Sequence, residues 1–297
     1  MSRFACGKTH TMLATSRTRA PSPRVVHQMF DCVEQTPDRE YLIRVSYMEI
    51  YKEVVADLLA EGAGTPKGLR IHEDPQGQVY VSELRELCVN TPEMLLGLMG
   101  RGETARHFGV TNMNDRSSRS HTIFRIIIES RVRDEEGEEG AVVVSHLNLV
   151  DLAGSERARQ TGATGERFRE GCSINSSLFE LGNVISKLSE GAPFINYRNS
   201  KLTRILQTSL GGNAKTAIIC TVTPAAVEET HSTLRFASRA KTIKNKPHIN
   251  EVVSDSAHLK RLKREIHGLR AELQREKQTN RATEVEEMQQ ALAEQSK

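Results

Sequence analysis

The chain has 297 residues, of which 37% are hydrophobic and 27% are charged, an ordinary composition for a globular protein. It contains no run of about eighteen apolar residues and no signal-peptide pattern at its amino terminus, so neither a membrane span nor secretion is predicted. Five scattered cysteines without a C-x-x-C pair give no indication of a zinc site or a disulfide framework. We therefore expect reduced thiols in a cytosolic or nuclear protein.

The charge of the chain is unevenly distributed. Nine Lys or Arg and two acids lie between Tyr197 and His248, a local net charge of +7 in a chain whose total is +3. A basic surface of this kind attracts an acidic partner, whether nucleic acid, anionic lipid or an acidic protein lattice. A solvated helix face is the alternative interpretation. Because aromatic residues for base stacking are not interleaved with these charges, no nucleic-acid partner is predicted, and no membrane partner either.

The chain opens with Gly-Lys-Thr at positions 7–9. This tripeptide ends the Walker A loop, in which backbone amides cradle phosphates, the lysine adds a charge and the threonine hydroxyl holds magnesium. The match is partial, because Ser2 stands where the first glycine of the loop belongs and no room remains for a preceding strand.

Apolar periodicity predicts the elements that follow. They are a helix over 23–30, strands over 41–51, 79–89 and 122–128, and a helix that begins with a capping Thr91 and a proline. Glycine-rich segments at 61–68 and 134–140 indicate exposed loops.

A buried strand is predicted over Val142–Val150, and it ends on an acid, Asp151. In parallel α/β sheets ligands bind outside the carboxyl ends of strands, so Asp151 is placed to meet a metal or a phosphate. Gly154 then allows the backbone to approach a ligand closely.

The remaining segments continue the same α/β pattern. A flexible loop over 161–166 precedes a helix over 174–188, whose apolar residues form one face. A buried strand over 215–224 and a last core helix over 228–241 follow, and Pro247 then prevents helix continuation. A short heptad seam, weakened by Gly268, leaves a monomer or weak dimer and a stable coiled coil equally open; its members are Leu259, Leu262, Ile266, Leu269 and Leu273.

Four motifs in this order resemble the kinesin motor domain, and the resemblance covers roughly Gly7 to Asn250. They are G-K-T-H-T-M at 7–12, N-D-R-S-S-R-S-H at 114–121, H-L-N-L-V-D-L-A-G-S-E at 146–156 and Y-R-N-S-K-L-T-R at 197–204. Within that family the chain is most similar to the centromere-associated type.

The resemblance implies an α/β fold of the P-loop NTPase class, the kinesin-type motor head, with a mixed central sheet sandwiched between helices. It also implies that the chain lacks the strands preceding the P-loop, a loss that exposes apolar faces and unpaired backbone on their neighbours. The implied domains are a motor domain over 1–241, a neck linker over 242–256 and a neck helix over 257–297, with a possible short coiled coil.

The resemblance also implies residue roles. Nucleotide binding falls to Cys6, Gly7, Lys8, Thr9 and His10, and the magnesium ligands are Thr9, Ser118 and Asp151. The catalytic set is Ser117, Arg119, Gly154 and Glu156, in which an Arg119–Glu156 ion pair would latch the two switch loops. Microtubule contacts fall to Arg198, Lys201 and Arg204, and neck-linker contacts to Ile243 and Asn250.

The implied function is that of a microtubule-based motor that couples hydrolysis of ATP, with Mg²⁺, to plus-end-directed movement. Its partner is the microtubule (tubulin), with a possible homodimer through the neck helix, and its location is the cytoplasmic microtubule cytoskeleton, including the spindle or kinetochore. Two alternatives stay open: a microtubule binder that works without ATP hydrolysis, and a partner-dependent fragment without a stable fold.

Overall fold

The structure, a computed structural model, describes the chain except residues 1–6, 14–19, 61–67, 76, 109–118, 134–140, 155–165, 253–269, 271–272 and 275–297. It divides into two compact units: the larger comprises Met1–Ser130 and Val144–Asn250, and the smaller comprises Arg131–Val143 and Glu251–Lys297. In the part of the chain that is described, no helix has the length and hydropathy needed to cross a membrane.

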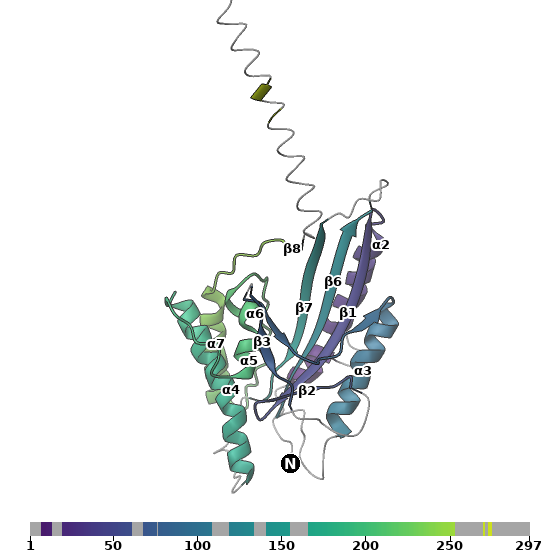
Figure 1. Cartoon of the computed structure of the whole chain (residues 1–297). Coiled ribbons are helices and arrows are strands. Elements are labelled where there is room, and N and C mark those ends of the chain that lie inside the picture. The colour runs from purple at the N-terminus through teal and green to yellow at the C-terminus, as the bar shows by residue number, and fades with distance from the viewer. Residues whose placement is uncertain are drawn as a thin grey trace, which may run out of the picture. The chain divides into compact units, whose positions relative to one another are not determined.

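Strands and helices occur in runs along the described chain, with β1 to β5 in succession and later α4 to α7 in succession (Figure 1). The helices are α1 (Lys8–Leu13), α2 (Pro21–Glu34), α3 (Pro92–Phe108), α4 (Glu166–Ser189), α5 (Lys201–Ile205), α6 (Gln207–Gly211) and α7 (Val227–Thr242). The strands are β1 (Arg39–Tyr51), β2 (Val54–Asp57), β3 (Ile71–Glu73), β4 (Val79–Val81), β5 (Leu87–Val89), β6 (His121–Val132), β7 (Val142–Asp151) and β8 (Glu251–Val252).

The main sheet of the larger unit runs in the order β2-β1-β6-β7, and β5 also pairs with β1. β2 and β5 are both antiparallel to β1, with Ile50 opposite Val55 and Ile43 opposite Val89. β3 and β4 form a separate antiparallel hairpin. In the smaller unit, β8 pairs antiparallel with Val142 and Val143.

Both faces of this sheet are covered by helices, because β1 carries apolar residues on both sides. Ile43, Val45 and Tyr47 belong to the cluster that includes residues of α2 and α3. Met48 and Ile50 belong to a second cluster, built with residues of α4, α5 and α6. Figure 1 shows α2 and α3 on one side of the sheet and α4 to α7 on the other. The mixed sheet sandwiched between helices is therefore confirmed for the larger unit.

Several predicted elements are found where the periodicity placed them. α2 covers the predicted helix 23–30, and β1, β6 and β7 contain the predicted strands. α3 begins as expected, with the Met94 amide donating to the Thr91 hydroxyl at 3.2 Å. α4 buries Leu181 and Ile185 against the second cluster, as the predicted apolar face requires.

The prediction of one strand over 79–89 is wrong. β4 ends at Val81, the chain turns at Ser82 and Glu83, and β5 begins at Leu87. Glu83 has a φ of 60°, in the left-handed region, which interrupts an extended strand. As a result, β4 pairs with β3 and β5 pairs with β1, in two different sheets.

The predicted buried strand over 215–224 is also wrong. Residues 214–223 form no strand, and Ile218, Ile219 and Val222 are 45%, 54% and 53% exposed. An apolar segment becomes a buried strand only if another strand pairs with its backbone and a layer covers its side chains. No strand in the described part of the chain pairs with these residues.

Burial is also lower than expected in β7 and α7. In β7 only Asp151 is buried, and the rest of the strand is half-buried or exposed. α7 was predicted to be a core helix, but it has no buried residue, and Leu234 is 53% exposed. Phe236 and Ala240 of α7 still pack against the second cluster, so the helix lies at the edge of the core.

The predicted neck helix and its heptad seam lie outside the described residues, apart from Arg270, Leu273 and Gln274. The predicted loops lie there too, with the exception of a few terminal residues. The domain boundaries at 241 and 256 stay predictions.

Candidate functional site

Helix α1, near the start of the sequence, contacts the end of β7. The Thr9 hydroxyl of α1 donates a hydrogen bond to Asp151 Oδ2 at 2.6 Å, although 142 positions separate the two residues. Gly7 makes this approach possible, because its φ of +68° is a conformation that side-chain-bearing residues rarely adopt. The Thr11 amide then donates to the Gly7 carbonyl at 2.8 Å and starts α1. Two of the three predicted magnesium ligands are thus in contact.

A buried arginine contacts the Asp151 side chain of this pair, and it was not predicted from the sequence. Arg106 of α3 is fully buried, and one of its terminal nitrogens donates to Asp151 Oδ2 at 3.1 Å. Its Nε and its other terminal nitrogen donate to the hydroxyl and carbonyl oxygens of Ser120, at 3.2 and 2.9 Å. Arg106 therefore connects the end of α3, the start of β6 and the end of β7. Its position at the end of an apolar helix, just before the serine-rich motif, was the available signal.

His121 links three further parts of the site. Its Nδ1 accepts a hydrogen bond from the Ala153 amide at 3.1 Å, and its Nε2 lies 2.8 Å from the Ser177 hydroxyl of α4. Burial, together with the smaller effects of the Arg106 and Lys8 charges, lowers the pKa of His121 to about 4. The ring is therefore neutral at pH 7, with its proton on Nε2, and it donates to Ser177.

The lowered pKa of His121 predicts that the free energy of unfolding of the chain decreases in acid. Because the folded pKa lies below the unfolded value of about 6.5, the unfolded chain binds the proton first as pH falls, and stability is lost between about pH 6.5 and pH 4. A shift of this size corresponds to about 3 kcal/mol. We expect chemical denaturation of the parent chain to show a steeper loss between pH 7 and pH 4 than the His121→Asn variant does. The exposed His231, replaced by Asn, is the control. Parallel pH curves for the parent chain and His121→Asn would contradict the assignment.

The residues around Asp151 fit a magnesium ion. Asp151 Oδ1 is buried, and no hydrogen-bond donor from the described residues satisfies it. The Thr9 hydroxyl oxygen lies beside the same carboxylate, and carboxylate and hydroxyl oxygens are the hard ligands that Mg²⁺ prefers. Magnesium commonly uses one or two protein ligands together with nucleotide phosphates and water. Among the described residues, no group of three or more His, Cys, Asp or Glu could hold a metal.

The other predicted site residues are placed as follows. Lys8 is half-buried at the start of α1, and His10, two residues on, is exposed. Gly154 is buried three residues after Asp151, and Arg119 lies in a turn just before β6. Cys6, Ser117, Ser118 and Glu156 lie outside the described residues, so the Arg119–Glu156 latch stays a prediction.

Two arginines of the predicted basic surface form ion pairs with an acidic residue, and the sequence did not indicate this pairing. Glu73 of β3 pairs with Arg198 at 3.0 Å and with Arg204 at 2.8 Å. Hydrogen bonds from these two arginines lower the pKa of Glu73. The Arg204 side chain is only 16% exposed, whereas that of Arg198 is 72% exposed. Of these two arginines, Arg198 is therefore the one better placed to meet a partner.

Lys201 begins α5 beside them. Its amide donates to Glu53 Oε2 at 2.7 Å, and the side chain of Ser200 caps the helix. Glu53 thus fixes the start of α5 through the backbone of Lys201, and its carboxylate also accepts a hydrogen bond from the Ser200 hydroxyl.

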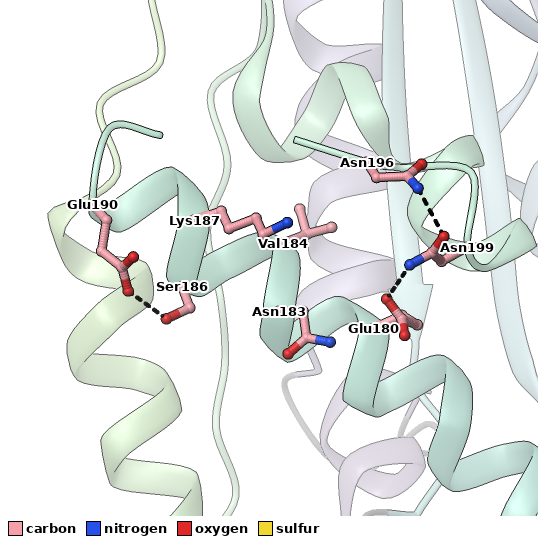
Figure 2. A pocket seen from close by; sticks show the side chains of 8 residues that line it. All are labelled: Glu180, Asn183, Val184, Ser186, Lys187, Glu190, Asn196 and Asn199. Atoms are coloured by element: carbon pink, nitrogen blue, oxygen red, sulfur yellow. Dashed lines mark hydrogen bonds between the residues drawn. The ribbon is translucent and has the colours of Figure 1, made fainter. Parts of the chain in front are cut away.

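A polar hollow of about 290 Å³ lies next to this surface, between α4 and residues 196–199. Figure 2 shows Asn199 in its wall, donating to Glu180 and accepting from Asn196. Neither Thr9 nor Asp151 lines it, so the hollow is separate from the contact between α1 and β7.

The segment that follows α7, up to Asn250, packs against other parts of the larger unit. The backbone carbonyl of Asn250 accepts from the Val144 amide at 2.9 Å, and its side chain donates to the Val144 carbonyl at 3.2 Å. Asn213 contacts the same segment twice, donating to Asn250 Oδ1 and accepting from the His248 amide, both at 2.6 Å. Ile243 packs against the second core cluster. Both predicted contact residues, Ile243 and Asn250, therefore contact other parts of the larger unit.

Comparisons with known proteins agree with one family. Centromere-associated protein E of Homo sapiens is 56% identical over 285 residues, which are 95% of this chain and 10% of that protein. Kinesin-like protein KIN-7L of Oryza sativa subsp. japonica is 55% identical over 273 residues, 90% of this chain and 42% of that protein. The chain thus spans less than half the length of these two relatives.

Solved structures agree with the sequence comparison. A KIF14 dimer in its two-heads-bound state, with AMP-PNP and in complex with a microtubule, matches with a TM-score of 0.75 at 40% identity, covering 83% of this chain and 71% of that one. A fast kinesin matches with a TM-score of 0.75 at 44% identity, covering 86% and 72%. The model of the kinesin motor domain matches residues 3–243. The chain therefore belongs to the kinesin motor domain family, whose members are microtubule-stimulated ATPases.

Proposed function

We propose that this chain is an ATP-hydrolysing motor head that moves along microtubules, and that the contact of Thr9 with Asp151 marks its nucleotide site. This single observation carries the proposal, because it joins the Gly-Lys-Thr segment to an acid at the end of β7. The orphaned Oδ1 of Asp151 supplies the oxygen that a magnesium ion requires.

The residues at this site would act by position and charge. Phosphoryl transfer needs little covalent chemistry from the protein, which contributes fixed charges and oriented groups. Lys8 contributes a positive charge toward the phosphates, and Thr9 and Asp151 hold the magnesium ion. That ion, when bound, neutralises charge that develops on the phosphate oxygens. Ser117 would orient the attacking water, and Arg119 and Glu156 would join the two loops around it.

Movement requires that the site communicate with the rest of the head. His121 bonds both to Ala153, just after β7, and to Ser177 of α4, so a change at the nucleotide site reaches that helix directly. The packed segment 243–250 supports a role as a neck linker, in agreement with plus-end direction. Dimerisation would involve residues beyond this segment.

The microtubule is the partner that best fits the basic surface. The KIF14 relative is seen in complex with a microtubule, and tubulin presents the acidic lattice that such a surface attracts. Arg198, 72% exposed, is the side chain with which we expect the strongest contact. A location on the cytoplasmic microtubules follows, with the spindle or kinetochore as the finer proposal from the likeness to centromere-associated protein E.

The test is ATP turnover by the chain with and without microtubules. We expect microtubules to stimulate turnover, and Arg198→Ala to raise the microtubule concentration for half-maximal stimulation about threefold to tenfold, because it removes a charge that steers and holds the acidic lattice. Arg24→Ala is the matched control, since Arg24 is exposed on α2, which covers the other face of the sheet. Turnover without stimulation would contradict the motor function, and equal effects of both variants would contradict the assigned surface.

An ATP-independent microtubule binder is the second candidate. It is favoured by the separation of the basic surface from the Thr9–Asp151 contact, since none of Glu73, Arg198 and Arg204 takes part in that contact. Microtubule binding that does not change with added nucleotide would support it.

A further inference from the structure

The part of α3 that carries Arg106 also packs closely against a tyrosine of β1. Tyr47 of β1 is 2% exposed, and its ring meets Phe124 edge-on, with centroids 5.1 Å apart. A Cβ at Gly102 would lie only 2.2 Å from the Tyr47 ring. Because Gly102 has no side chain, α3 comes close enough for the Tyr47 hydroxyl to donate to Glu103 Oε1.

Glu103 in turn faces Arg106, three residues along the same helix. Its Oε2 lies 3.7 Å from the terminal nitrogen of Arg106 that also donates to Asp151. One guanidinium nitrogen is therefore shared between two carboxylates, one from Glu103 and one from Asp151. The Glu103 side chain is 18% exposed and that of Asp151 is 5% exposed, so water screens neither pair strongly.

Burial and the nearby Glu103 carboxylate raise the pKa of Tyr47. The tyrosine thus remains a protonated donor at neutral pH, and it can anchor one oxygen of Glu103 permanently. The other oxygen is then left to face Arg106.

The charges of this group do not cancel. Among the side chains of Arg106, Glu103 and Asp151, one positive charge faces two negative charges, and the Asp151 carboxylate lies beside Thr9. If Glu103 were neutral, Arg106 would neutralise Asp151 alone, and the site would attract a cation less strongly.

We propose that Tyr47 and Glu103 are positioning residues for the nucleotide site: Tyr47 anchors Glu103, Glu103 shares Arg106 with Asp151, and this sharing preserves the negative charge with which Asp151 binds magnesium. The inference rests on the proposed function of that site. It adds two residues that do not touch nucleotide or metal, and it assigns them control over the magnesium requirement rather than over the chemical step.

The test is the Mg²⁺ concentration needed for half-maximal binding of a fluorescent ADP analogue, measured beside ATP turnover at saturating Mg²⁺. Glu103→Gln keeps the shape and an acceptor for Tyr47 but removes the charge. We expect it to raise the half-saturating Mg²⁺ concentration about tenfold, while turnover at saturating Mg²⁺ changes by no more than about twofold. Tyr47→Phe keeps the ring contacts and frees Glu103, and we expect a smaller shift, about threefold, in the same direction.

The matched control is Glu93→Gln, which removes the same charge from an exposed position in the first turn of α3. We expect it to match the parent chain. An unchanged Mg²⁺ requirement in Glu103→Gln overturns the inference, and if that variant melts below the assay temperature an unchanged requirement in Tyr47→Phe does so instead. If the parent chain binds the ADP analogue but without any dependence on Mg²⁺, the proposed function of the site fails, and the inference fails with it.

Discussion

Replacing Arg106 by methionine is expected to lower the free energy of unfolding by about 3–5 kcal/mol. The guanidinium is fully buried, and Asp151 is 5% exposed, so the variant leaves a carboxylate without its cation in a place that water hardly reaches. The hydroxyl and carbonyl oxygens of Ser120 lose the hydrogen bonds that Arg106 donates at the same time. Methionine retains much of the volume, which makes the lost polar contacts the main cause. Equilibrium denaturation in urea measures the change.

Arg101→Met is the matched control for this variant. Arg101 lies on the same helix, is exposed, and donates one hydrogen bond to the Leu59 carbonyl at 3.3 Å, so its loss should cost about 1 kcal/mol. The double variant Arg106→Met with Asp151→Leu removes both charges, and it should be more stable than Arg106→Met alone. A loss below about 1 kcal/mol for Arg106→Met would show that the buried pair does not stabilise the head.

The parts of the fold that could be predicted are those determined by local pattern. The alternating and continuous apolar runs of β1, β6 and β7 identify strands, and the capping threonine before α3 identifies a helix start. Asp151 could be placed at the end of a strand because the apolar run of β7 stops on this acid. The contact of Thr9 with Asp151 across 142 positions was implied by the resemblance to the kinesin motor domain and not by any local pattern.

The parts that could not be predicted depend on neighbours far away in the chain. Residues 215–224 have the composition of a buried strand, but composition does not supply a pairing partner. Arg106 resembles any helical arginine until the fold places Asp151 and Ser120 around it. Glu73 and Arg198 are 125 positions apart, and no spacing rule relates a short hairpin to the start of a distant helix.

The three open functions make different predictions for the Lys8 side chain. Lys8 is half-buried at the start of α1, next to Thr9, and its charge contributes to the lowered pKa of His121. A motor head uses this charge to stabilise the phosphates as hydrolysis proceeds. A nucleotide-independent binder does not use it, and a chain without a stable fold has no fixed position for it.

Lys8→Ala is therefore expected to reduce microtubule-stimulated ATP turnover by about 10²–10³-fold, the usual consequence of removing one fixed group that stabilises developing charge. Because Lys8 is not part of the Glu73–Arg198–Arg204 surface, binding to microtubules without nucleotide should change by less than about twofold. Arg24→Ala, at an exposed position on α2, is the control and should leave turnover unchanged. Microtubule binding that survives with no turnover in either the parent chain or the variant would favour the nucleotide-independent binder.

The thermal melt of the parent chain tests the third hypothesis. A folded chain should melt in one cooperative step, since the hydrogen bonds that join α1, α3, β6 and β7 are lost together. A broad, non-cooperative melt would instead favour a fragment that needs a partner to fold.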